Sequence, residues 1–230
     1  MVALELDVPS TVRLPAALHR QQLVRLSVDG WTRVLQQPWD AEARACLDLW
    51  AKRGLPLVVT RQPPSLGGLL ATGLPAPARF GRRRLAVAVA SRDVLFLDEF
   101  PSAPAVTRLL PRAVATTWRA LIAQLAANDC AARVYGGHGW QALTRMAYVH
   151  AESDVDLLLP VASNAQADAV AQVLASIAWD GPRLDGELLL PDGGAVAWRE
   201  WREHREGRVA QVLVKRLRGV ALETPVARLA

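Results

Sequence analysis

The amino-acid sequence predicts a two-domain protein of the α/β (α+β) class. A smaller N-terminal α/β domain is expected over residues 1–113, and a C-terminal domain with a mixed sheet flanked by helices over 114–230. The 230 residues suffice for two small domains, each with its own core. Apolar runs of strand length alternate with segments of helical periodicity in both halves. A proline-containing stretch over 100–112 separates the halves and is a candidate linker.

The N-terminal half is predicted to contain one helix followed mainly by strands. Residues 40–53 are expected to form the helix, because Asp40 is a favourable N-cap, apolar residues recur at helical spacing and Gly54 can end it. Residues 62–81 are rich in proline and glycine and are expected to form a long loop, which either acts in function or merely connects strands. The predicted strands are 55–61, 82–90 and 94–97.

The C-terminal half alternates between helices and strands. Its first helix is capped by Thr116 or Thr117 and presents Trp118, Leu121, Ile122 and Leu125 on one face. Further helices are predicted from about Trp140 to Met146 and over 163–178. Strands are predicted at 132–137, 153–160, 183–191, 195–201 and 209–215.

The charge of the chain favours anionic partners. The net charge is +5, and almost all positive side chains are arginines, since Lys52 and Lys215 are the only lysines. A basic protein is predisposed to bind polyanions or an acidic partner protein.

Cys46 and Cys130 lack metal-binding spacing and are expected to be buried free thiols. The sequence shows neither a signal peptide nor a run of about 20 apolar residues, so a cytoplasmic location without membrane association is expected.

Two aspartates at the start of one predicted strand are the candidate catalytic residues. Asp154 and Asp156 point to the same face of that strand, because side chains alternate along it. Neighbouring carboxylates repel each other, and a divalent cation offsets that repulsion. Mg²⁺ prefers carboxylate oxygens together with substrate phosphates and water. Asp154 and Asp156 are therefore predicted to bind Mg²⁺ and to act in a displacement at phosphorus.

A glycine pair precedes these aspartates. Gly136 and Gly137 follow a predicted strand and precede a helix, where the backbone can approach a phosphate closely. Each signal alone is weak, since most glycine pairs are plain turns and acidic residues often begin strands at the surface. The order of glycine pair, helix, Asp-x-Asp and apolar run is more specific, and it favours a nucleotidyltransferase-type site.

Three further candidates have open alternatives. Glu187 is preferred over Asp185 as a third metal ligand because it directly precedes an apolar run; alternatively, Asp185 belongs to a turn and Glu187 lies at the surface. Lys215 either neutralises a substrate phosphate or is a solvated strand end. His138 either contacts phosphate or, in the preferred interpretation, is a loop histidine without a role.

The stretch RVYGGHGWQALTRMAYVHAESDVDLLLP resembles the phosphoribosyl-dephospho-CoA transferases, also described as malonate decarboxylase holo-acyl-carrier-protein synthases. Three other segments are also similar to that family: RLDGELLLPDGGAVAWREW, QVLVK and WAKRGLPLVVTRQ. The resemblance therefore covers nearly the whole chain. It implies a nucleotidyltransferase-like catalytic domain that moves the prosthetic group from triphosphoribosyl-dephospho-CoA to a serine of the acyl-carrier subunit of malonate decarboxylase, releasing pyrophosphate. It also implies that Asp154 and Asp156 form the catalytic, metal-binding pair and that Gly136 belongs to the phosphate-contacting turn.

One position departs from the pattern. Gly137 stands where a serine is expected, and the missing hydroxyl group would remove a hydrogen bond to phosphate worth about 1.5–3 kcal/mol.

Two other functions stay open. One is a small nucleotidyltransferase that uses a nucleoside triphosphate on RNA, protein or a small molecule, and the other is a non-catalytic module that binds the carrier protein. Nucleic acid is not expected as a partner of the preferred enzyme.

Overall fold

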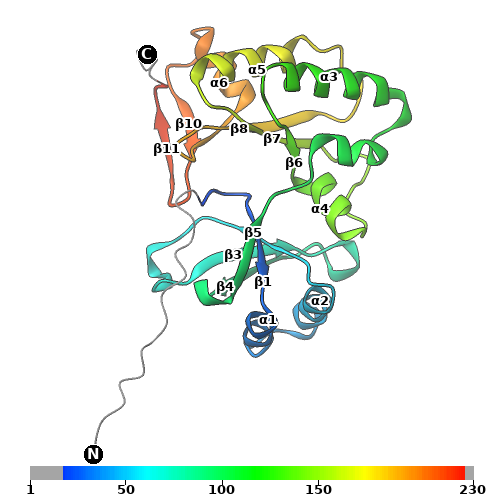
Figure 1. Cartoon of the computed structure of the whole chain (residues 1–230), viewed down its shortest axis with the longest axis vertical. Coiled ribbons are helices and arrows are strands. Elements are labelled where there is room, and N and C mark those ends of the chain that lie inside the picture. Colours follow the sequence, from blue (N-terminus) through cyan, green and yellow to red (C-terminus); the bar gives the residue numbers. More distant parts are fainter. Residues whose placement is uncertain (1–17, 226–230) are drawn as a thin grey trace, which may run out of the picture.

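The computed structural model describes residues 18–225 and confirms the predicted α+β class. Within this range the strands form two sheets, one with the order β4-β3-β2-β1-β5 and one with the order β11-β10-β9-β8-β7-β6. Figure 1 shows the two sheets one above the other, with helices on their outer sides. None of the described helices is long and apolar enough to cross a membrane.

The first sheet is antiparallel and belongs to the N-terminal half. Its strands are β1 (Leu23–Leu26), β2 (Leu57–Val59), β3 (Leu70–Pro75), β4 (Arg84–Val89) and β5 (Val94–Asp98). The helices α1 (Val28–Leu35) and α2 (Ala41–Lys52) cover its outer face, as Figure 1 shows. Asp40 caps α2 as predicted, because its side chain accepts a hydrogen bond from the Ala43 N–H.

The expectation of one continuous loop over 62–81 was wrong for residues 70–75. Residues 70–75 form β3, the second strand from the edge of the sheet, and only short 3₁₀ turns at Pro64–Leu66 and Ala78–Phe80 flank it. The glycine that suggested a loop serves close packing instead, because a Cβ atom at Gly73 would lie 2.6 Å from the Leu85 carbonyl oxygen. Pairing with β2 and β4 therefore outweighs the weak local strand propensity.

Residues 100–112, expected to be a linker, are ordered and packed. They contain the 3₁₀ helix Ala103–Leu109 and lead into a second one at Arg112–Val114. Ala103 and Val106 are buried in the core of the C-terminal half, which we call the second core, whereas Phe100 is buried in the N-terminal first core. The chain therefore passes from one core to the other within a few residues.

The second sheet is mixed, as predicted for the C-terminal half. Only its β7–β8 pair is parallel. Its strands are β6 (Arg133–Val134), β7 (Val155–Pro160), β8 (Leu184–Leu189), β9 (Ala195–Ala197), β10 (Val212–Lys215) and β11 (Val220–Glu223). Its helices are α3 (Ala115–Ala127), α4 (Gly136–Thr144), α5 (Asn164–Ser176) and α6 (Trp198–Arg205). In Figure 1, α3, α5 and α6 lie on the side away from the first sheet.

The strand predicted at 195–201 was too long. β9 ends at Ala197, and α6 begins at Trp198. Trp198 and Trp201 are both buried, and their spacing of three residues fits one face of a helix, with charged residues on the other. The periodicity changes from that of a strand to that of a helix inside one apolar-rich segment.

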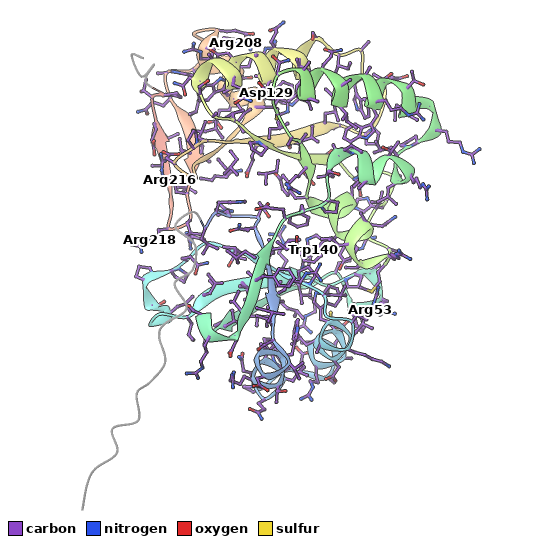
Figure 2. The ribbon with its side chains drawn as sticks, in the orientation of Figure 1. Arg53, Asp129, Trp140, Arg208, Arg216 and Arg218 are labelled. Carbon is purple, nitrogen blue, oxygen red and sulfur yellow. The ribbon has the colours of Figure 1, made fainter. Side chains whose placement is uncertain are left out.

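Helix α4 connects the two halves. It follows β6 of the second sheet, yet its Trp140 side chain is only 4% exposed and belongs to the first core. The Trp140 ring lies 5.5 Å from that of Phe100 and 6.4 Å from that of Trp50, measured between centroids. Figure 2 shows Trp140 in the zone between the two sheets. The helix that carries the glycine pair is thus anchored by the N-terminal half.

Candidate active site

A cleft of about 640 Å³ lies between the two halves. Residues of β2, β3 and β4 line it from the first sheet, together with Arg20 and Gln21. Tyr135, Gly136, Gly137 and Asp156 line it from the second half. Three of the predicted site residues therefore face one cavity, and the N-terminal half forms its opposite wall.

Gly136 and Asp156 are in intimate contact. A Cβ atom at Gly136 would lie 1.9 Å from Asp156 Oδ2, so no residue with a side chain fits there while the carboxylate keeps its place. Gly136 also has a φ of +58°, which side chains disfavour. The Tyr135 N–H, one residue earlier, donates a 3.0 Å hydrogen bond to the Asp156 carbonyl oxygen. The predicted glycine turn and the predicted catalytic strand are therefore joined at this point.

The start of α4 is suited to an anion. The helix begins at Gly136, and the side chain of its N-cap, Tyr135, makes no capping hydrogen bond. The amides of the first helical turn have no acceptor within a helix and carry the positive end of its dipole. A Cβ atom at Gly137 would find its nearest neighbours 4.0 Å away, at Ser153 Oγ and the Tyr148 carbonyl oxygen. Gly137 thus leaves open space at the turn, where a serine side chain fits.

Asp156 stands among other acidic groups. Burial first, and then the charges of Asp185, Asp154 and Glu187, raise the pKa of Asp156 from 3.8 to about 6. Strand register explains the nearest neighbour, because Asp156 on β7 pairs with Asp185 on β8. Glu187, two residues further along β8, lies on the same face. A cation placed here would offset this repulsion.

Neighbouring cations already hold three of these carboxylates. The Arg183 guanidinium lies 3.1 Å from Asp154 and 2.7 Å from Asp185. Lys215 Nζ donates a 2.6 Å hydrogen bond to Glu187 Oε1, and Glu187 is buried. Lys215 is therefore not merely a solvated strand end, and Glu187 is not at the surface. By register, Asp185 rather than Glu187 stands opposite Asp156, so the preference for Glu187 as third metal ligand has no support from strand pairing.

The donor set suits Mg²⁺ without enclosing it. Over residues 18–225 no group of three or more acidic, histidine or cysteine side chains is arranged to hold a metal ion by itself. Mg²⁺ characteristically binds one or two carboxylates and takes its other ligands from phosphates and water. Asp156, with Asp154 two residues earlier in the chain, fits that pattern, since the charge of Asp154 is among those that raise the Asp156 pKa.

His138 has a structural role that the sequence did not indicate. It lies inside α4 rather than in a loop, and it is buried. Its Nδ1 donates a 2.9 Å hydrogen bond to the carbonyl oxygen of Asp154, and burial lowers the pKa of the imidazole. A neutral His138 thus ties α4 to the backbone that presents the two aspartates, so the expectation of a histidine without a role was wrong.

Comparison with known proteins gives the family. The sequence models for the phosphoribosyl-dephospho-CoA transferase MdcG match over two ranges, the N-terminal domain at residues 19–98 and the C-terminal domain at 101–225. The chain belongs to the phosphoribosyl-dephospho-CoA transferase family. It is thus an enzyme of that transferase class, as the sequence resemblance implied, and the two matched ranges correspond to the two sheets.

Curated relatives agree with this family. A phosphoribosyl-dephospho-CoA transferase of Xanthomonas euvesicatoria is 41% identical over 75% of this chain and 80% of its own length. The transferase of that name from Bradyrhizobium diazoefficiens is 34% identical over 88% of both chains, and that from Pseudomonas aeruginosa is 34% identical over 77% and 81%. No solved structure matches this phosphoribosyl-dephospho-CoA transferase.

Most residues that line the cleft were not identified as site residues from the sequence, among them Arg20, Gln21, Arg84 and Tyr135. Tyr135 had one signal, its position directly before the glycine pair. Arg20 and Arg84 had none, because they are two arginines among many in this chain and lie far from the motifs.

Proposed function

We propose that this transferase moves the 5-phosphoribosyl-dephospho-CoA group from its triphosphate precursor to a serine of the acyl-carrier subunit of malonate decarboxylase, with release of pyrophosphate. The observation that carries the proposal is the contact of Asp156 with Gly136 at the start of α4, inside the cleft. That contact brings a carboxylate and a phosphate-binding turn together, which is the arrangement that phosphoryl chemistry needs. Tyr135, which leads into the turn, is the N-cap of the same helix.

Mg²⁺ is the proposed cofactor, held by Asp154 and Asp156 with the phosphates of the donor. When bound it neutralises phosphate charge and lowers the pKa of the serine hydroxyl group. The other roles belong to the chain itself. The amides at Gly136 and Gly137 bind a phosphate at the N-terminus of α4. His138 holds the Asp154 backbone in position.

The reaction is a displacement at the α-phosphorus. The serine oxygen forms a bond to that phosphorus, and the bond to the oxygen that bridges to the β-phosphate breaks. The electron pair remains on the departing pyrophosphate, and the serine proton passes to water. Both halves of the chain contribute walls to the cleft, so the phosphate lies between them in this proposal.

The Lys215–Glu187 pair has a supporting place in this proposal. Lys215 is one-third exposed, and its ammonium group is held at 2.6 Å by Glu187, on the strand face that also carries Asp185. In this position Lys215 limits the negative charge of the cluster. An incoming polyphosphate therefore meets less repulsion than four uncompensated carboxylates would produce.

Intact mass spectrometry of the carrier tests the proposal. The apo acyl-carrier subunit is incubated with this protein, Mg²⁺ and triphosphoribosyl-dephospho-CoA, and a second sample contains ATP instead. The expected result is a mass gain equal to the full prosthetic group, abolished by EDTA and by Asp154→Asn. Asp180→Asn, in an exposed loop, is the matched control and is expected to keep the transfer rate.

Two outcomes contradict the proposal. A mass gain with ATP alone identifies a nucleotidyltransferase of different donor choice. No gain with either donor, from a protein that is folded and binds the carrier, identifies a module without catalytic activity.

A further inference from the structure

Two arginines of the N-terminal half face the catalytic cleft. Arg20 precedes β1, and Arg84 is the first residue of β4, where it pairs with Pro75 of β3. Both line the cavity that Asp156 and Gly136 line from the other side. Guanidinium groups are suited to bidentate hydrogen bonds with phosphate oxygens. The N-terminal wall is thus positively charged where the C-terminal wall is negatively charged.

Within the part of the chain that the structure describes, no carboxylate pairs with these guanidinium groups. Among the ion pairs within residues 18–225, none includes Arg20 or Arg84. Arg83, the chain neighbour of Arg84, shows the contrast, because its guanidinium lies 2.6 Å from Asp40. A cation that lines a cavity without a carboxylate partner among the described residues is suited to an anionic ligand.

Arg20 is held in place by its neighbours. His19 Nδ1 lies 2.7 Å from the Arg20 carbonyl oxygen, and His19 Nε2 lies 3.2 Å from Glu99 Oε1. Burial lowers the pKa of this imidazole, but the hydrogen bonds to Glu99 and to the Arg20 carbonyl oxygen outweigh that effect and raise the pKa above its usual value. The next residue, Gln21, has a φ of +68°, a conformation that side chains disfavour and that clusters at functional sites. The backbone is therefore fixed at the point where Arg20 enters the cleft.

Arg20 and the catalytic face border the same space. The cavity that Arg20 lines is also lined by Tyr135 and Asp156 from the opposite wall. A ligand that fills this cavity therefore lies between the guanidinium group and the catalytic face.

We infer that Arg20 and Arg84 bind the terminal pyrophosphate portion of the donor's triphosphate, across the cleft from Gly136. This assignment rests on the proposed function. The β- and γ-phosphates gain negative charge as the bond to the α-phosphorus breaks, and two guanidinium groups on the far wall stabilise that charge. In this proposal the N-terminal half belongs to the active site, and its role there is to bind the leaving pyrophosphate.

Binding of inorganic pyrophosphate without metal tests the inference directly. Titration calorimetry at low salt compares the full-length protein with Arg20→Gln, Arg84→Gln and Arg119→Gln. Arg119 is an exposed arginine on α3, outside the cleft. The expected result is a roughly tenfold to hundredfold weaker affinity for each of the first two variants, from the loss of charge-assisted hydrogen bonds. Arg119→Gln is expected to bind as the unchanged protein does.

A second arm separates the two pyrophosphate groups of the donor, because dephospho-CoA contains one of its own. Both cleft variants are expected to keep their affinity for dephospho-CoA. Loss of dephospho-CoA binding with unchanged pyrophosphate binding overturns the assignment to the leaving group. Equal pyrophosphate affinity in all four proteins, or no measurable binding, overturns it as well.

The two proposals fail separately. Pyrophosphate binding that depends on Arg20 and Arg84, in a protein that transfers nothing to the carrier, leaves the phosphate site standing and refutes the proposed function. Transfer at an unchanged rate and donor KM in both variants, with unchanged pyrophosphate binding, refutes the phosphate site alone.

Discussion

Replacing Asp156 by asparagine is expected to stabilise the protein while it abolishes transfer. The carboxylate is largely buried among other acidic groups, and its pKa is raised from 3.8 to about 6. A shift of that size corresponds to about 3 kcal/mol at 1.36 kcal/mol per pH unit. Because part of the group faces water, we discount this to roughly 1–2 kcal/mol. The amide keeps the shape of the side chain and removes the charge.

The stabilisation depends on pH in a defined direction. Well below pH 3.8 the carboxyl group is protonated in folded and unfolded chains alike, so protein and variant have similar stability. Between pH 3.8 and about 6 the unfolded chain releases its proton more readily than the folded one, and the unchanged protein loses stability relative to the variant. Above that range the difference is constant.

Urea denaturation between pH 4.5 and 8, without metal, measures the effect. The unfolding free energy of Asp156→Asn is expected to exceed that of the unchanged protein by a margin that grows to a plateau, with a rise in Tm of about 2–8 °C for a protein of this size. Asp154→Asn is the control, because the Asp154 side chain is 36% exposed and its carboxylate pairs with Arg183. It is expected to lose activity without this gain. Equal or lower stability of Asp156→Asn at pH 8 would refute the electrostatic reasoning.

Three further changes test the turn and the strand pair. Gly136→Ala is expected to lower the transfer rate more than tenfold and to destabilise the fold by about 1–3 kcal/mol, because its Cβ would overlap Asp156 Oδ2; kinetics and urea denaturation measure both. Gly137→Ser is expected to fold normally and to lower the donor KM by up to roughly tenfold, since space is free and a hydroxyl group can bind phosphate; an unchanged or raised KM contradicts this. Lys215→Met is expected to cost about 1–3 kcal/mol by leaving the buried Glu187 without its cation, and the double change with Glu187→Gln should restore most of it.

The sequence predicted what local pattern determines. The strand that carries Asp156 was identified from its apolar run, and β7 covers most of the predicted residues. The glycine pair was correctly expected where a strand gives way to a helix, but β6 ends at Val134 and α4 begins at Gly136 itself, four residues before the predicted helix start. These features depend on side-chain alternation and backbone freedom over a few residues, which one sequence displays directly.

Features that depend on distant segments were not predictable in the same way. β3 was hidden by glycine and proline, and only its neighbours β2 and β4 define it as a strand. The opposition of Asp156 and Asp185 follows from the parallel register of β7 and β8, which periodicity does not supply. Arg20 and Arg84 reach the cleft because the two sheets face each other, and no local signal marks them.

The position of Trp140 has a consequence for how the enzyme comes into being during synthesis. The phosphate-binding turn opens a helix whose indole is enclosed by Trp50 and Phe100, residues made much earlier on the ribosome. Until α4 has been synthesised, the first core therefore lacks the Trp140 side chain that completes its packing. Assembly of the turn and completion of the earlier half are thus one event, so a chain interrupted before α4 has neither a finished interior nor a reactive centre.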